Sequence, residues 1–281
     1  MIPPSILALY EAEVRKLLSR TSARVGLVLA LLLGLGVPIL RGLWQVGMVY
    51  VASQNGADAS QIPAVDPTGP VYFTLWLRNF FLLRVFLIMI GALSFAGEYQ
   101  TRTLREDLLR PVSRPAILLT KWLALVTWIA ATMVLSGGTA SLVSLIAFPG
   151  GEGWGTLALQ YLVAILCDAG FAAVVLLVAV LIRSVAGTLA GMFLFYLADL
   201  ATAVGLMLMA SVPMFGLDKS AQELAAQVSP WLPSAAFAAW NGGTIWASAG
   251  TWSAPAFASL GVLTFGSLLL AIWQFNRLDV P

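Results

Sequence analysis

The sequence contains no histidine and a single cysteine, Cys167, in 281 residues. One cysteine cannot build a disulfide framework within the chain. Zinc sites with imidazole ligands, Ser-His-Asp triads and haem ligation by histidine all need a side chain that this protein lacks. The phosphate-binding pattern Gly-x-x-x-x-Gly-Lys-Ser/Thr is also missing. Most enzyme classes are therefore excluded, and any ATP hydrolysis linked to this protein must occur on a partner chain.

Charge is scarce too, because 10% of the residues are charged and 60% are hydrophobic, with a mean hydropathy of +0.91. A soluble domain carries about a quarter charged residues, so this apolar surplus requires lipid. About 20 apolar residues cross the hydrocarbon core of a bilayer. The pattern predicts an all-α membrane protein, a single transmembrane domain over residues 1–281. Its six transmembrane helices are expected near residues 25–47, 71–95, 122–148, 156–182, 187–212 and 254–275.

Two stretches outside these spans have predicted structures of their own. Residues 6–20 place apolar side chains on one helical face and Glu11, Glu13, Arg15 and Lys16 opposite them. This predicts an amphipathic helix within residues 1–23 that lies in the membrane interface. Residues 213–253 alternate polar residues with short apolar runs and contain four tryptophans. We expect this outer segment to be partly re-entrant, with its tryptophans at the membrane surface.

The basic residues predict the orientation. Residues 51–70, after the first span, contain no Lys or Arg, whereas residues 97–121 contain five. Loops rich in Lys and Arg stay on the cytoplasmic side. The loop 97–121 and both termini are therefore predicted to be cytoplasmic, and no nucleic-acid partner is needed to explain the basic pI. The five residues are Arg102, Arg105, Arg110, Arg114 and Lys121.

Apart from Arg41, which is assigned to the outer end of the first span, four charged residues fall inside predicted spans, namely Arg78, Arg84, Asp168 and Asp199. The last three should lie near the midplane, where an unpaired charge costs at least about 2.5–3.5 kcal/mol. We expect Arg84 to pair with Asp168 or Asp199, within the chain or across a dimer interface. Arg78 is expected to reach outward to the interface. This intramembrane polar network is open to three interpretations: a structural salt bridge, a polar lining or gate, and a proton relay.

The cytoplasmic loop is the most informative segment. Residues 95–124 read FAGEYQTRTLREDLLRPVSRPAILLTKWLA, in which leucines recur at helical spacing before a proline ends the helix. This loop resembles that of ABC-2-type ABC-transporter permeases. Arg102 stands where that family usually has glycine. The matching residues are Glu98, Thr103, Leu104, Leu108, Leu109, Pro111, Val112, Ser113, Arg114 and Lys121.

The resemblance implies a coupling helix that inserts into a groove of a separate ATP-binding subunit. The implied partner-binding residues are Glu98, Arg102, Thr103, Leu104, Arg105, Leu108, Leu109, Arg110, Pro111 and Arg114. It also implies six spans, an interfacial N-terminal helix and a partly re-entrant segment before the last span. The chain itself would hold no cofactor and no metal, because ATP and Mg²⁺ would bind the partner.

The expected assembly is an ABC exporter in a bacterial cytoplasmic (inner) membrane, surrounded by membrane lipids. Two copies of the ATP-binding subunit would join a second copy of this chain or a related permease, with room for an additional periplasmic or outer-side partner. Two alternatives stay open. A secondary, proton-coupled transporter would use Asp168 and Asp199 as titrating groups, and a non-transporting membrane assembly factor would bind partners through the same loop.

Overall fold

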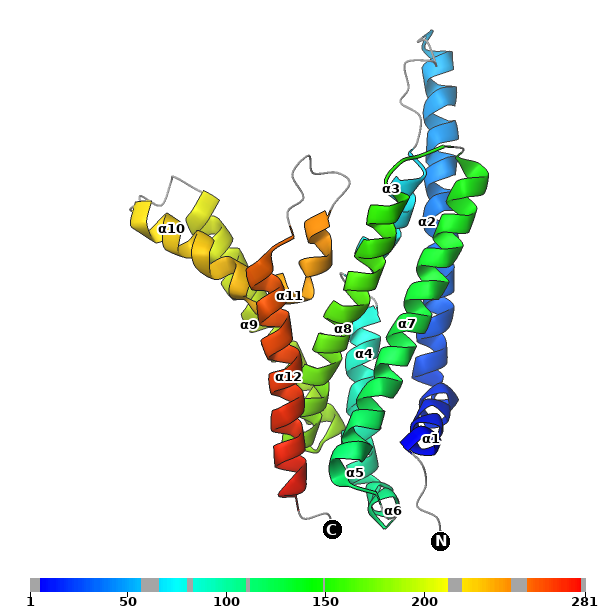
Figure 1. Ribbon diagram of the computed structural model, residues 1–281. Coiled ribbons are helices and arrows are strands. Elements are labelled where there is room, and N and C mark those ends of the chain that lie inside the picture. Colours follow the sequence, from blue (N-terminus) through cyan, green and yellow to red (C-terminus); the bar gives the residue numbers. More distant parts are fainter. Residues whose placement is uncertain are drawn as a thin grey trace.

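The computed structural model describes residues 6–56, 66–79, 83–109, 112–148, 150–211, 219–243 and 252–278, and every regular element in these ranges is helical. The long helices stand side by side, while short helices gather at both ends (Figure 1). The elements are α1 (Ile6–Ser19), α2 (Thr21–Gln54), α3 (Thr68–Leu77), α4 (Leu83–Ala92), the π-helical turn η3 (Leu93–Gly97), α5 (Glu98–Gln100), α6 (Leu104–Leu108), α7 (Arg114–Ala147), α8 (Trp154–Ile182), α9 (Val185–Ser211), α10 (Lys219–Val228), η5 (Ser229–Trp231), α11 (Pro233–Phe237), η6 (Ala239–Gly243) and α12 (Ala254–Asn276).

Five of the described helices are long and apolar enough to cross a membrane: α2, α7, α8, α9 and α12. Their outer surfaces carry large exposed apolar side chains, such as Val262 and Phe265 on α12, which only lipid or another apolar partner can cover. The predicted second span is divided between α3 and α4, and residues 80–82 lie outside the described residues. The chain is therefore an integral membrane protein, and the count of six spans stays a prediction.

One end of the bundle collects α1, α5, α6 and the C-terminal end of α12; we call it the α6 end (Figure 1). The predicted amphipathic helix is present as α1, but its apolar side chains Leu9 and Leu17 are buried. They pack in the protein core that also contains residues of α7, and α1 and α7 are in extensive contact. The helix therefore uses part of its apolar face for the protein itself.

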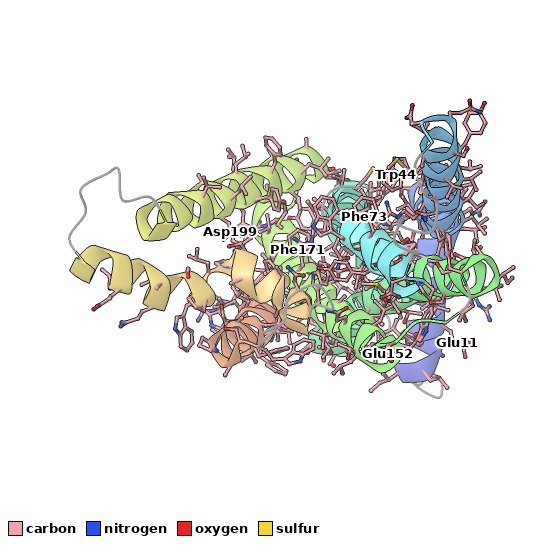
Figure 2. All side chains as sticks on the ribbon, turned by 90° about the horizontal axis from the view of Figure 1, so that it is seen from above. Glu11, Trp44, Phe73, Glu152, Phe171 and Asp199 are labelled. Carbon is pink, nitrogen blue, oxygen red and sulfur yellow. The ribbon has the colours of Figure 1, made fainter. Side chains whose placement is uncertain are left out.

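The opposite end, which we call the far end, carries the predicted outer segment. Between residues 219 and 243 the chain forms α10, η5, α11 and η6, and the rest of residues 213–253 is described only at Trp252 and Ser253. Seen from above, α9 and α10 extend away from the packed helices (Figure 2). Phe237 of α11 is buried and meets Phe171 of α8 edge to face, with ring centroids 5.2 Å apart. Re-entry into the membrane stays a prediction.

Close packing of α2 on α7 depends on small residues. Gly26, Ala30 and Gly34 recur every four positions and are buried. A Cβ atom at Gly34 would lie 1.9 Å from Thr139 Oγ1 and 2.5 Å from the carbonyl oxygen of Ser136. Such small-residue stripes let helix backbones approach closely in membranes. Gly187 and Gly191 of α9 serve the same purpose inside the chain, because Cβ atoms there would meet Ile182.

We predict that Gly34→Leu lowers the free energy of unfolding by about 1–3 kcal/mol, because the new side chain cannot fit between α2 and α7. Gly36→Leu is the matched control, since no atom lies within 4 Å of a Cβ at Gly36. Thermal unfolding in detergent, followed by tryptophan fluorescence, measures the difference. Equal midpoints for the two variants would contradict the packing described here.

Candidate coupling site and intramembrane charge cluster

A chain of six alternating charges holds the α6 end together. Lys121 of α7 is fully buried, and its Nζ lies 2.9 Å from Glu13 Oε2 and 2.5 Å from Glu98 Oε2. Arg20 continues the chain on one side, with its Nη2 3.1 Å from Glu98 Oε1. We call these residues, with the two described next, the ion network: Glu13, Lys16, Arg20, Glu98, Asp107 and Lys121.

Lys16 continues the ion network on the other side and connects α1 to α6. Its Nζ lies 3.0 Å from Glu13 Oε1 and 2.8 Å from Asp107 Oδ2. Burial alone would lower the pKa of Lys16, but the hydrogen bond to Asp107 and the charges of Glu98 and Glu13 outweigh burial and raise it. Lys16 therefore remains a cation throughout the neutral range. Because three cations balance the three carboxylates, which lie close together, we assign no metal to this cluster.

The predicted coupling residues divide into an internal and an exposed group. Leu104 is fully buried, and Glu98 is also buried. Leu109 is 78% exposed, and Arg102, Thr103 and Arg105 are exposed as well. Leu108 is half-buried against the core, while Arg110 and Pro111 lie outside the described residues. A docking surface on α6 is therefore limited to the exposed side chains, and the partner-binding role stays a prediction.

The backbone conformation at Arg102 is one that glycine adopts easily, in agreement with the glycine usual at this position in ABC-2-type permeases. Its φ is 62°, in the left-handed region that favours glycine because a Cβ atom is crowded there. The residue forms the sharp turn between α5 and α6.

Arg114 lies away from this turn and contacts the end of α12. Its Nη1 donates to the carbonyl oxygens of Phe275, Asn276 and Leu278. It satisfies the C-terminal end of α12, where a cation is favourable.

The segment around α5 also contacts the beginning of α9. The backbone N–H of Val185 donates to Gln100 Oε1 over 3.4 Å. The guanidinium of Arg183 lies 6.0 Å from the ring centroid of Tyr99, within the range of a cation–π contact. The loop between α4 and α7 is thus connected to α1, α7 and α9.

Inside the bundle, Arg78 and Asp168 form a buried salt bridge. Arg78 Nη1 lies 2.7 Å from Asp168 Oδ2, and both side chains are almost completely buried. Arg78 also donates to Asn79 Oδ1, Thr132 Oγ1 and the carbonyl oxygen of Ile129. The expectation that Arg78 reaches outward is therefore wrong. The side chain of Arg78 lies between α7 and α8, because Thr132 belongs to α7 and Asp168 to α8.

Arg84 and Asp199 complete the intramembrane cluster. Arg84 Nε lies 3.8 Å from Asp168 Oδ1, and its Nη2 donates to the carbonyl oxygen of Phe237 over 2.7 Å. Asp199 is half-buried, faces Ser234 at the start of α11 and lies within electrostatic range of Arg84. Seen from above, it is on the side of α9 that faces α11 (Figure 2). The expected pairing of Arg84 with Asp168 is present within the chain, as a longer contact than that of Arg78.

Sequence reasoning missed most of the ion network. Glu13 and Lys16 were expected on the solvent face of α1, and Lys121 was expected in the loop with no partner assigned. Two signals were available: Glu13 and Lys16 have the i, i+3 spacing of a helical ion pair, and Asp107 is an acid within a basic loop. Neither signal predicts that Glu13 and Asp107 are buried or that they share a network with Lys121.

We predict that Lys121→Met destabilises the protein by about 3–5 kcal/mol, because it leaves Glu13 and Glu98 buried without their shared cation. Lys121→Arg, which keeps the charge, should retain more of the stability. Thermal unfolding midpoints of the purified proteins measure both effects. If the Met variant melted at the temperature of the unchanged protein, the ion network would not be the constraint that its geometry indicates.

For the intramembrane pair we predict non-additive effects. Asp168→Leu leaves two buried guanidinium groups, and Arg78→Leu leaves a carboxylate with only the distant Arg84, so each should strongly reduce folded yield. The double variant Arg78→Leu/Asp168→Leu should recover part of the loss, by about 0.5–3 kcal/mol of coupling. The yield of monodisperse protein and the thermal unfolding midpoint in detergent are measured for both single variants and the double variant, which together form a double-mutant cycle. Strictly additive losses would argue against direct pairing.

Comparison with known proteins adds an independent line of evidence. The sequence profile of a family described as ABC-2 family transporter protein matches residues 12–199. This range contains most of α1, the whole ion network, both arginines of the intramembrane cluster and α9 up to Asp199. A separate sequence search among curated proteins found no match.

Proposed function

This chain belongs to the ABC-2 family of transporter proteins, and from that premise we propose that it is the permease subunit of an ATP-driven exporter. Members of the family are membrane components that work with an ATP-binding subunit and are not themselves catalytic. In our proposal two ATP-binding subunits bind the α6 ends of two permease chains, either two copies of this one or this chain and a related permease. The α6 end faces the cytoplasm in this arrangement, in agreement with the basic loop.

The observation that carries the proposal is the ion network around Lys121. It fixes α6 to α1 and α7 on one side, while the other side of α6 remains exposed with Arg105 and Leu109 available for contact. An exposed helix that is rigidly supported from behind is suited to receive a push from a partner. Exposed charges favour correct docking, and an exposed leucine contributes apolar burial.

The contacts of α5 and α4 suggest how such a push reaches the membrane. α4, η3 and α5 follow one another without interruption from Leu83 to Gln100. Movement of α5 would therefore act on Arg84 through α4, on the start of α9 through Gln100, and on the end of α8 through Tyr99 and Arg183. Arg84 contacts α11 through the carbonyl of Phe237. Closure of the ATP-binding subunits would shift α4 and α9 relative to α8 and α11.

The proton-coupled alternative is less consistent with the charge cluster. A proton taken up by Asp168 would leave Arg78 and Arg84 without their shared counter-ion, which is costly in a low-dielectric interior. A structural salt bridge therefore describes Asp168 better than a proton relay does. Asp199 makes no ion pair at 4.0 Å or less among the described residues, and we assign it to the polar lining near α11.

The test of the proposal is assembly with an ATP-binding protein encoded beside this chain. We expect the two to co-purify and transport to require ATP. The double variant Arg105→Glu/Leu109→Ser should weaken capture and ATPase stimulation at least roughly tenfold, because it reverses a charge and removes an apolar anchor at the exposed side of α6.

Arg277→Glu is the matched control, since Arg277 is also exposed at the α6 end but lies at the end of α12 and stacks on Trp273 at 3.9 Å. It should leave capture unchanged. Transport by the chain alone in vesicles without ATP would overturn the proposal, and so would equal capture of the α6 double variant and the unchanged protein.

A further inference from the structure

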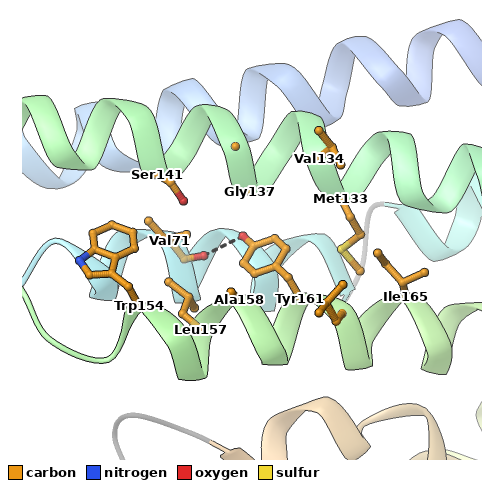
Figure 3. A pocket seen from close by; sticks show the side chains of 12 residues that line it. Val71, Met133, Val134, Gly137, Ser141, Trp154, Leu157, Ala158, Tyr161 and Ile165 are labelled. Carbon is orange, nitrogen blue, oxygen red and sulfur yellow. Dashed lines mark hydrogen bonds between the residues drawn. The ribbon is translucent and has the colours of Figure 1, made fainter.

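A groove of about 410 Å³ opens between α7 and α8 in the half of the bundle away from α6, and the proposed function makes no use of it. Figure 3 shows it from close by, with Trp154 at one end and Ile165 at the other. Its walls are carbon atoms almost throughout. Ser141 and the indole of Trp154 also bring polar atoms to the lining, while the hydroxyl of Tyr161 is already donated to the carbonyl oxygen of Val71.

Two neighbouring glycines shape the groove. Gly137 lets the ring of Tyr161 lie directly against α7, because a Cβ atom there would be 2.4 Å from the ring. Gly138 faces the open space, and nothing lies within 4 Å of a Cβ built on it. Glycine in the middle of a helix weakens the helix, so a pair of them at a hollow needs a packing reason. The reason here is the room that they leave between the two helices.

The mouth of the groove faces the bilayer. Val134 and Leu162 stand at its rim and are 70% and 61% exposed, on helices long enough to cross a membrane. The groove extends from the middle of α8 to its first residue, Trp154, so it spans the depth of one leaflet at the far end. Tryptophan at a helix end is typical of the membrane interface. An elongated apolar hollow at this depth matches the hydrocarbon chain of a lipid.

Charge near the mouth favours one kind of headgroup. Residues 122–182 contain no Lys or Arg, and their two acids are Asp168, which is paired in the interior, and Glu152 in the exposed loop before α8. Asp66 is a further acid beside this loop, since its Oδ1 lies 3.3 Å from a Cβ built on Gly151. The rim is therefore negative, so it attracts an ammonium group and repels a headgroup with net negative charge.

We propose that this groove binds one acyl chain of a zwitterionic phospholipid, whose ammonium group lies near Glu152 and the ring of Trp154. The acyl chain fills the space beside Gly138. The ammonium group is stabilised by the carboxylate of Glu152 and by a cation–π contact with the indole ring of Trp154. This lipid site does not depend on ATP coupling or on the identity of the transported substrate.

The site can be tested with a phosphatidylethanolamine that carries a photoreactive diazirine on its acyl chain. In vesicles that contain this probe as a minor component, labelling should be strongest within residues 133–165. Gly138→Leu fills the open space without a clash and should lower that labelling at least roughly tenfold, since contact with two methylene groups already corresponds to this factor. Gly266→Leu on α12 is the control, because a Cβ there also meets nothing within 4 Å but lies outside the groove.

The headgroup is tested by competition. Unlabelled phosphatidylethanolamine should displace the probe roughly threefold better than phosphatidylglycerol with the same chains. Glu152→Gln should remove this preference while leaving labelling by the acyl chain in place. The proposal is overturned if Gly138→Leu and Gly266→Leu label alike, or if the two lipids compete equally with the unchanged protein. Loss of ATP-dependent transport in any variant has no bearing on these readouts.

Discussion

The ammonium of Lys121, enclosed between Glu13 and Glu98, is the constraint on which the α6 end depends. A buried cation without partners would be very costly, so α1 and α5 must both remain against α7 for the charge to be tolerated. Lys16 and Arg20 extend the same condition to α6 and to the junction of α1 with α2. Segments more than a hundred residues apart in the sequence therefore behave as one unit, and the position of the exposed side of α6 follows from it.

The intramembrane cluster imposes a similar condition at the middle of the bundle. Arg78 at the end of α3 needs Asp168 of α8 and the polar groups of α7, and Arg84 of α4 shares the same carboxylate. The continuous path from Leu83 to Gln100 joins Arg84 to Glu98, so the two charged clusters are connected by a single helical segment. A displacement at either cluster must be taken up by the other or by the turns of η3. This connection makes a role in coupling physically reasonable for a chain of the ABC-2 family.

Hydropathy predicted the helical bundle because apolar runs of about 20 residues leave few alternatives in a membrane. The spacing of the leucines predicted one helix in the loop 97–121, where the structure has the two short helices α5 and α6. The spacing could not tell that Leu104 is buried and Leu109 exposed, because both fit one amphipathic pattern. The prediction for Arg78 failed because the charges were paired by their expected depth in the membrane, which left Arg78 without a partner, whereas burial of Arg78 depends on Asp168, 90 residues later. Burial of Glu13, but not of its neighbour Glu11, depends on where Lys121 lies. Such pairings over long sequence separations depend on the tertiary structure, and helical periodicity, which is a local pattern, cannot predict them.

The ionic character of the α6 end also bears on how it can move. An apolar contact of similar area would be as stable, but it is non-directional and would tolerate sliding of α1 along α7. Six alternating charges permit a single register, because a shift of one turn would bring like charges together. Three acids balance three bases, so the network can move as a whole without exposing charge to lipid, whereas separating its parts would leave buried ions unpaired. A force on the exposed side of α6 should therefore displace α1, α5 and α6 together with the beginning of α7, as a rigid body.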